Sequence, residues 1–151
     1  MLFRTHFLFG LLIFFILSPH TSIPTLLFLC SILLGVAIVD IDTKKSKLGR
    51  KKLFRPIQFF VSHRGIFHSF FSALILSLLL YFFFKDFATG FFIGYLSHLF
   101  LDTLTKTGTP LFWPLTHKHT KFFIQTGGLL EDILFLFLLT LNIHFSLSSF
   151  F

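Results

Sequence analysis

One apolar run carries a small or polar residue at every fourth position: Gly90, Gly94, His98 and Asp102. This spacing places the four residues on one face of a helix. Glycines on that face allow a second helix to approach closely, and an imidazole one turn from a carboxylate can share a metal ion with it. The pattern predicts a pair of metal ligands inside a helix bundle; the alternative is a histidine that is merely oriented by the carboxylate.

Two further motifs supply ligands of the same types. Asp40 and Asp42 end a second apolar run, where the negative end of the helix dipole calls for a positive partner. His63 and His68 precede a third run, and we expect His68 in the first turn of its helix, where the dipole favours the neutral, metal-binding imidazole. Nearby lysines are the alternative partners of the carboxylates, but three carboxylates beside histidines favour a divalent cation.

Three residues are candidates for catalytic roles. Arg64 can clamp a phosphate or another anionic oxygen, although it is equally suited to anchoring at anionic head groups. A carboxylate that binds no metal, either Asp42 or Glu131, can act as a general base, although an acid in the first turn of a helix also suits the helix dipole. The other histidines receive no metal role: His117 and His119 form a surface pair, and His6, His20 and His144 are assigned no function.

The elements that position these residues are membrane helices. The 151-residue chain is 54% hydrophobic and 13% charged, with a mean hydropathy of +0.86, so it has more apolar surface than a soluble domain of its size can bury. Apolar runs occupy residues 8–17, 23–39, 67–84, 87–101 and 129–143. The sequence predicts an all-α, polytopic membrane helical bundle of about four to five transmembrane helices, formed as a single domain over residues 1–151.

The basic residues predict which helix ends face the cytoplasm. With five spans and the N-terminus inside, all of the 13 Lys and Arg residues except Lys85 lie on the cytoplasmic side, as the positive-inside rule requires. The same orientation brings every acidic residue except Asp86 to that face. It also accounts for the net charge of +7, so no nucleic-acid partner is expected. The first run lacks a signal-peptidase motif and is expected to stay uncleaved, and residues 53–61 are expected to be interfacial or re-entrant.

The motifs also stand in a familiar order. They are Asp40-Ile41-Asp42, His63-Arg64-Gly65-x-x-His68-Ser69 and Gly94-x-x-Ser97-His98-x-x-x-Asp102-x-x-Thr105-x-x-Gly108, followed by Trp113-Pro114. Over residues 30–135 the chain resembles the YdjM-like family of membrane-bound metal-dependent hydrolases. The resemblance implies a multi-span inner-membrane protein with an Asp/His metal centre and an ester or phosphoester substrate. Two features depart from the family pattern: Phe67 replaces a small hydroxylated residue, and the loop with His117 and His119 is unusually rich in histidine.

The leading hypothesis is a membrane-embedded hydrolase that uses a divalent metal, zinc or manganese, at the cytoplasmic face. Its substrate would be a lipid ester or a phosphoester. The predicted metal ligands are Asp40, Asp42, His63, His68, His98 and Asp102. One alternative is a non-catalytic membrane anchor that binds a regulator through the basic loop 44–55. Another is a metal-ion transporter, which is disfavoured because the centres of the apolar runs lack the polar groups of a pathway.

Overall fold

The structure, a computed structural model, describes the chain except residues 43–49, 51–54, 56–64 and 149–151. In the described residues the α-helices are α1 (Phe3–Leu17), α2 (Thr25–Ile38), α4 (Phe70–Tyr81), α5 (Lys85–Thr103) and α6 (Leu129–Ser148). Short 3-10 helices form η1 (Ser18–His20), η2 (Val39–Asp42) and η4 (Ile66–His68). The all-α prediction is confirmed, and each predicted apolar run corresponds to one of these α-helices.

The helices have the lengths and surfaces of a membrane protein. Phe3–His20, Thr25–Asp42 and Leu129–Ser148 are long and apolar enough to cross a bilayer, and α4 is a shorter apolar helix. Large apolar side chains are exposed along α4 and α6, which would be unfavourable in water and is expected against lipid. The predicted interfacial segment 53–61 and the basic loop 44–55 lie largely outside the described residues.

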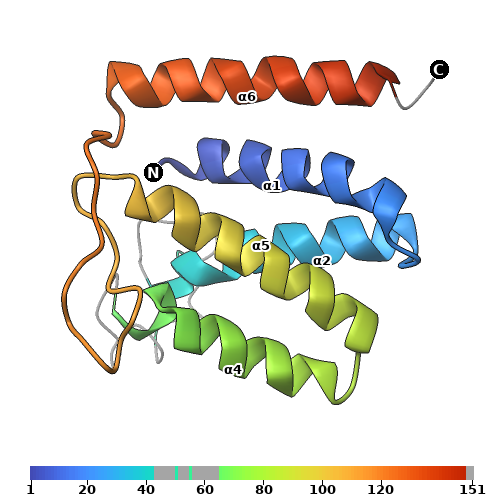
Figure 1. Ribbon diagram of the computed structural model, residues 1–151, viewed down its shortest axis with the longest axis horizontal. Coiled ribbons are helices and arrows are strands. Elements are labelled where there is room, and N and C mark those ends of the chain that lie inside the picture. The colour runs from blue at the N-terminus through green and yellow to red at the C-terminus, as the bar shows by residue number, and fades with distance from the viewer. Residues whose placement is uncertain (43–49, 51–54, 56–64, 149–151) are drawn as a thin grey trace.

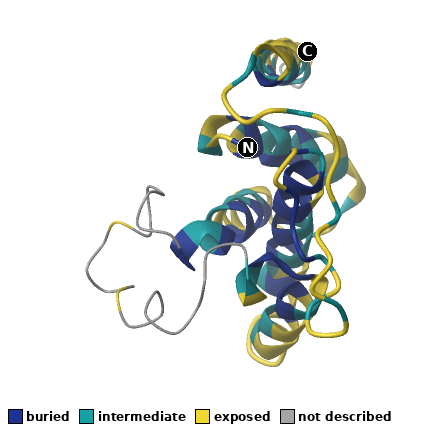
Figure 2. Ribbon diagram, turned by 90° about the vertical axis from the view of Figure 1, so that its left-hand side faces the viewer, coloured by how far each residue is buried: buried dark blue, intermediate teal, exposed yellow. Residues whose placement is uncertain are grey.

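The chain passes back and forth, so helix ends from distant parts of the sequence meet at one end of the bundle. Helices α1, α4 and α6 begin at that end, on the left of Figure 1, and α2 and α5 finish there. Helix α5 packs between α2 and α4, while α1 contacts both α2 and α6. Figure 2 shows that α5 is the most deeply buried helix and that α6 lies at the periphery.

Glycines bring α2 and α5 into backbone contact. A Cβ atom at Gly94 would collide with the carbonyl oxygen of Ile32, and one at Gly35 would collide with the carbonyl oxygen of Phe91. The close helix approach predicted from the glycine spacing is therefore confirmed. Because the contact is between backbones, it fixes the distance between α2 and α5 one turn before His98.

The connection from α5 to α6 folds over the same end of the bundle. Lys106 N donates to Ile124 O at 2.9 Å, and Thr109 and Thr120 exchange backbone hydrogen bonds of 3.1 and 2.8 Å. Gly108 permits this pairing with a φ of 61°, since a side chain there would also meet the backbone of Thr120. The connection is tied to the start of α4, where Phe70 N donates to Leu111 O at 2.8 Å.

Candidate metal centre

Two short segments bring Asp40, Asp42 and His68 together. Asp40 and Asp42 lie in η2, directly after α2 ends at Ile38, and His68 ends η4. The prediction that His68 lies in the first turn of a long helix is wrong. Ser69 has extended backbone angles and caps α4, its Oγ accepting from Ser72 N at 3.2 Å, so α4 begins only at Phe70.

The two nitrogens of His68 face different carboxylates. Nδ1 lies 3.3 Å from Asp42 Oδ2, whereas Nε2 lies 3.7 Å from Asp40 Oδ1 and 3.5 Å from Asp102 Oδ2. A carboxylate on the far nitrogen of a metal-binding histidine orients the ring. The geometry therefore favours an orienting role for Asp42 over the direct ligand role predicted from the sequence.

Tyr95 contributes to the position of His68 from the neighbouring helix. Its hydroxyl donates to the carbonyl oxygen of Phe67 at 2.5 Å, and its side chain is fully buried in α5. This bond holds the residue just before His68. The backbone of Phe67, rather than its side chain, makes the contact, so the bulky ring that departs from the family pattern does not interrupt it.

His98 has a tautomer fixed by the backbone of α2. Its Nδ1 donates to Val36 O at 2.8 Å, because a carbonyl oxygen can only accept. In the neutral ring, Nε2 therefore carries a lone pair. That atom lies 3.7 Å from Asp40 Oδ1 and 3.7 Å from Asp102 Oδ2, too far for a hydrogen bond, and it has no hydrogen-bond partner among the residues that the structure describes.

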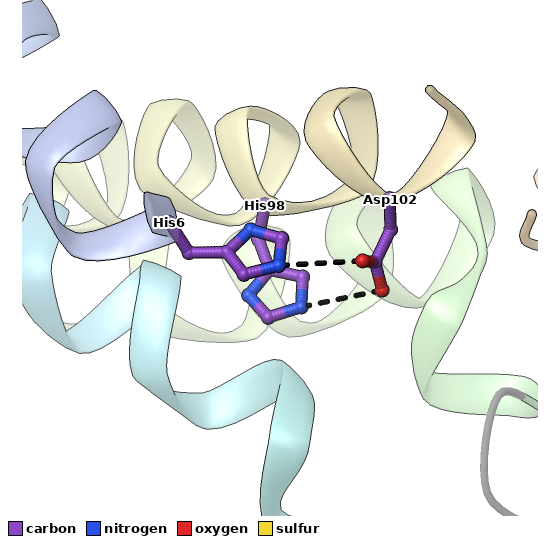
Figure 3. Close-up of side chains that lie close together, drawn as sticks. All are labelled: His6, His98 and Asp102. Carbon is purple, nitrogen blue, oxygen red and sulfur yellow. Dashed lines mark ion pairs between the residues drawn. The ribbon is translucent and has the colours of Figure 1, made fainter. Parts of the chain in front are cut away.

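His6 joins the same cluster, although the sequence analysis gave it no role. Its ring is 1% exposed and stacks on His98, with ring centroids 3.8 Å apart and planes inclined by 6°. Its Nε2 lies 3.3 Å from Asp102 Oδ1 (Figure 3). The sequence contains one signal for this position: His6, Gly10 and Phe14 stand four residues apart, as Gly90, Gly94 and His98 do on α5. All three residues are buried in α1.

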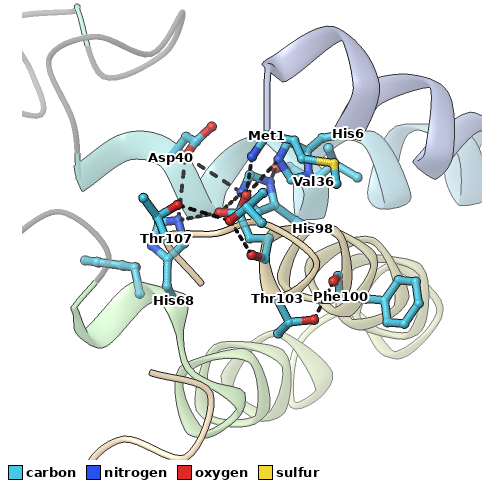
Figure 4. A network of polar contacts seen from close by, with 12 residues as sticks. Met1, His6, Val36, Asp40, His68, His98, Phe100, Thr103 and Thr107 are labelled. Carbon is cyan, nitrogen blue, oxygen red and sulfur yellow. Dashed lines mark hydrogen bonds and ion pairs between the residues drawn. The ribbon is translucent and has the colours of Figure 1, made fainter. Parts of the chain in front are cut away.

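Asp102 is the point at which the cluster converges. Oδ1 faces His6 and also contacts the α-amino group of Met1, while Oδ2 faces His68 and His98. Figure 4 shows His6, Asp40, His68 and His98 meeting from α1, η2, η4 and α5, respectively. Asp102 is 2% exposed, so a carboxylate and three imidazoles share a region that is shielded from water.

Glu131 holds the start of α1 instead of pointing into this cluster. Its Oε1 accepts from Leu2 N at 2.6 Å and from Thr5 Oγ1 at 2.9 Å, and its Oε2 accepts from Gly127 N at 2.7 Å. Since His6 follows Thr5 directly, this clamp sets the position from which His6 reaches Asp102. The geometry favours an anchoring role for Glu131 over the predicted role of general base.

Replacing Glu131 by alanine is expected to destabilise the protein by roughly 2–3 kcal/mol, because the buried donor on Thr5 and the partly buried donors on Leu2 and Gly127 lose a charged acceptor. Asp132→Ala is the matched control. Asp132 pairs with Arg4 on the surface, with both side chains about half exposed, and such pairs contribute at most about 1 kcal/mol. Unfolding of both variants in mixed detergent micelles measures the difference. Equal losses in the two variants would contradict the clamp.

The structure places the predicted site residues as follows. It brings together Asp40, Asp42, His68, His98 and Asp102, and it adds His6. His63 and Arg64 lie outside the described residues. His117 and His119 are exposed in the connection between α5 and α6, where the sequence placed a surface pair.

The cluster suits a divalent metal ion on two grounds. Both ring nitrogens of His6 and Nε2 of His98 are buried and form no hydrogen bond with any described residue, and such atoms are costly unless something binds them. The contacts from Nε2 of His68 and His98 to the carboxylates of Asp40 and Asp102 span 3.5–3.7 Å. Ligand atoms around a four-coordinate ion with bonds of 2.0–2.2 Å are about 3.3–3.6 Å apart. Mixed nitrogen and oxygen ligands favour zinc or manganese.

Comparisons with known proteins agree with this description. The family model described as YdjM inner membrane protein matches residues 1–149. Inner membrane protein YdjM of Escherichia coli (strain K12) is 38% identical over 95 residues, which cover 56% of this chain and 47% of that protein; the protein of the same name from Shigella flexneri matches equally.

A third relative matches over more of its length. The uncharacterized protein YvsG of Bacillus subtilis (strain 168) is 29% identical over 140 residues, covering 86% of this chain and 84% of that protein. No solved structure matches the chain. The alignments with the YdjM proteins span about half of their length. Since the family model covers nearly every residue, the chain belongs to the YdjM inner membrane protein family.

Proposed function

We propose that this membrane protein is a metal-dependent hydrolase that cleaves an ester or phosphoester bond, with zinc or manganese as its metal. One observation carries the proposal. The tautomer of His98 is fixed by Val36 O, so that the Nε2 lone pair faces the carboxylates of Asp40 and Asp102. A neutral imidazole lone pair that faces carboxylates in a buried region is repelled by them, and a divalent cation bound between them converts this repulsion into attraction.

The residues around that position divide into ligands and supports. Asp40, His68, His98 and Asp102 would hold the ion, while Asp42 orients His68 and Val36 O orients His98. When bound, a divalent ion supplies Lewis acidity, which activates water near neutral pH and polarises the scissile bond. The ligands come from different helix ends, so the bundle itself sets their spacing.

The exposure of the ligands indicates where a substrate enters. The side chain of Asp40 is 17% exposed, whereas those of His68, His98 and Asp102 are at most 3% exposed. We therefore expect the substrate to approach past Asp40, at the end of the bundle where α2 finishes.

The location of the centre favours hydrolysis over transport. All of its described residues lie at the end of the bundle where α1 and α4 begin and α2 and α5 finish. A transport pathway would need polar groups along the whole span. We place this end on the cytoplasmic side, by the charge distribution along the sequence.

Purified protein loaded with Mn²⁺ or Zn²⁺ is expected to hydrolyse at least one member of a panel of phospholipid vesicles, p-nitrophenyl phosphate and p-nitrophenyl acetate. Turnover should be lost on chelation and reduced more than about 100-fold by Asp40→Asn. His144→Ala, at an exposed position of α6, should keep wild-type turnover. Stoichiometric metal without turnover of any panel member would contradict the hydrolase and leave a metal-binding membrane protein.

A further inference from the structure

His6 and His98 present their nitrogens to Asp102 in a way that one metal ion cannot satisfy. A histidine binds metal along its lone pair, which lies in the plane of the ring. The two rings are nearly parallel, inclined by 6°, with centroids 3.8 Å apart. Lone pairs in parallel planes do not converge, so an ion in the plane of one ring lies well outside the plane of the other.

Asp102 offers a separate oxygen to each ring. His6 Nε2 lies 3.3 Å from Oδ1, and His98 Nε2 lies 3.7 Å from Oδ2; Figure 3 shows both rings directed at the carboxylate from the same side. A carboxylate whose two oxygens face two such nitrogens has the form of a bridging ligand. The ring separation of 3.8 Å falls within the roughly 3.5–4 Å that separates the ions of two-metal hydrolytic sites.

We propose that the centre holds two divalent ions bridged by Asp102, and that His6 is a ligand of the second. The first position has Asp40, His68 and His98 with Asp102 Oδ2; the second has His6 with Asp102 Oδ1. This inference rests on the proposed hydrolase function and extends it, because a pair of ions suits a phosphoester whose attacking and leaving oxygens both need stabilisation.

The second position already attracts a positive group. The α-amino group of Met1 contacts Asp102 Oδ1, so an ion bound there would take the place of that ammonium on the carboxylate. Fewer side chains reach this position than the first, and we therefore expect the second ion to bind more weakly. The open coordination positions that remain are those that a substrate oxygen can occupy.

The test is the number and magnetic coupling of manganese ions bound to the full chain in detergent micelles. Wild-type protein dialysed to equilibrium against excess Mn²⁺ is expected to bind two ions per chain above the level in the dialysis buffer, with the exchange-coupled electron paramagnetic resonance signal of a close pair. His6→Phe keeps a ring stacked on His98 but offers no ligand, and should retain one ion with an uncoupled signal. His20→Ala, at an exposed position, should match the wild type.

The outcomes separate this inference from the proposed function. One uncoupled ion in folded wild-type protein, or a coupled pair that persists in His6→Phe, would overturn the two-ion centre and leave a mononuclear hydrolase standing. No manganese or zinc in the wild type after supplementation would overturn both. A second variant, His6→Ala, guards against a steric effect of the phenylalanine ring: it should also bind one ion, with unchanged helical circular dichroism.

Discussion

Replacing His98 by alanine is expected to empty the metal centre. His98 faces Asp40 and Asp102 in the first position through its Nε2, and its ring stacks on His6 of the second position. Its loss should therefore affect every bound ion. Any hydrolytic turnover should fall by more than the roughly 10–100-fold that follows the loss of a partner outside the ligand set.

Elemental analysis of the purified protein measures this prediction without knowledge of the substrate. Near-stoichiometric metal is expected in the wild type and in His144→Ala, and almost none in His98→Ala. Because His98 also bonds to Val36 O, circular dichroism and gel filtration must establish that the variant is folded. A folded His98→Ala protein with undiminished metal content would refute the ligand assignment.

Replacing Gly94 by leucine is expected to abolish the native packing of α2 on α5. Even the first atom of a side chain there would collide with the carbonyl oxygen of Ile32, and a backbone atom cannot rotate away as a side chain can. Gly94→Ala should already cost roughly 1–3 kcal/mol, the range for overpacking. Gly94→Leu adds three further carbons and should separate the helices.

Stability in detergent and metal content should fall together in the Gly94 series, because His98 lies one turn further along the same face of α5. Gly128→Ala provides the milder comparison, since a Cβ there would lie 3.1 Å from Gln125 O, a tight contact but not a collision. It should retain its metal and lose less stability than Gly94→Ala. A Gly94→Leu protein that stays folded and binds metal normally would show that the helices need not touch.

The helices could be predicted from the sequence because the apolar pattern that forms each one lies within a single continuous segment. Apolar runs near the length of a membrane span mark α2, α4 and α6, and a regular spacing of glycines, His98 and Asp102 marks the buried face of α5. Asp40, His68 and Asp102 could be grouped because alternation of spans brings their helix ends to one side. None of these steps needs knowledge of which helix packs on which.

The features of the site that were not predicted depend on which helices pack against one another. His6 was missed because α1 is apolar on nearly all sides, so the four-residue spacing of His6 and Gly10 was the one indication of the face that meets α5. Glu131 was assigned as a base because its partners, Leu2 and Thr5, lie at the opposite end of the sequence. The position of Asp42 beside Nδ1 of His68 depends on the short 3-10 helices η2 and η4. Segments this short leave no hydrophobic periodicity in the sequence from which their geometry could be predicted.

The wide separation of the ligands along the chain also sets an order of biosynthesis. Helices α1 and α2 leave the ribosome and enter the membrane before α5 exists, and at roughly 5–20 residues per second His6 precedes Asp102 by several seconds. During that interval His6 lacks its neighbour Asp102, and Asp40 lacks its neighbour His98. The proposed metal centre would be complete only after α5 has inserted, and the later arrival of α6 with Glu131 fixes the start of α1, which is the part of the chain made first.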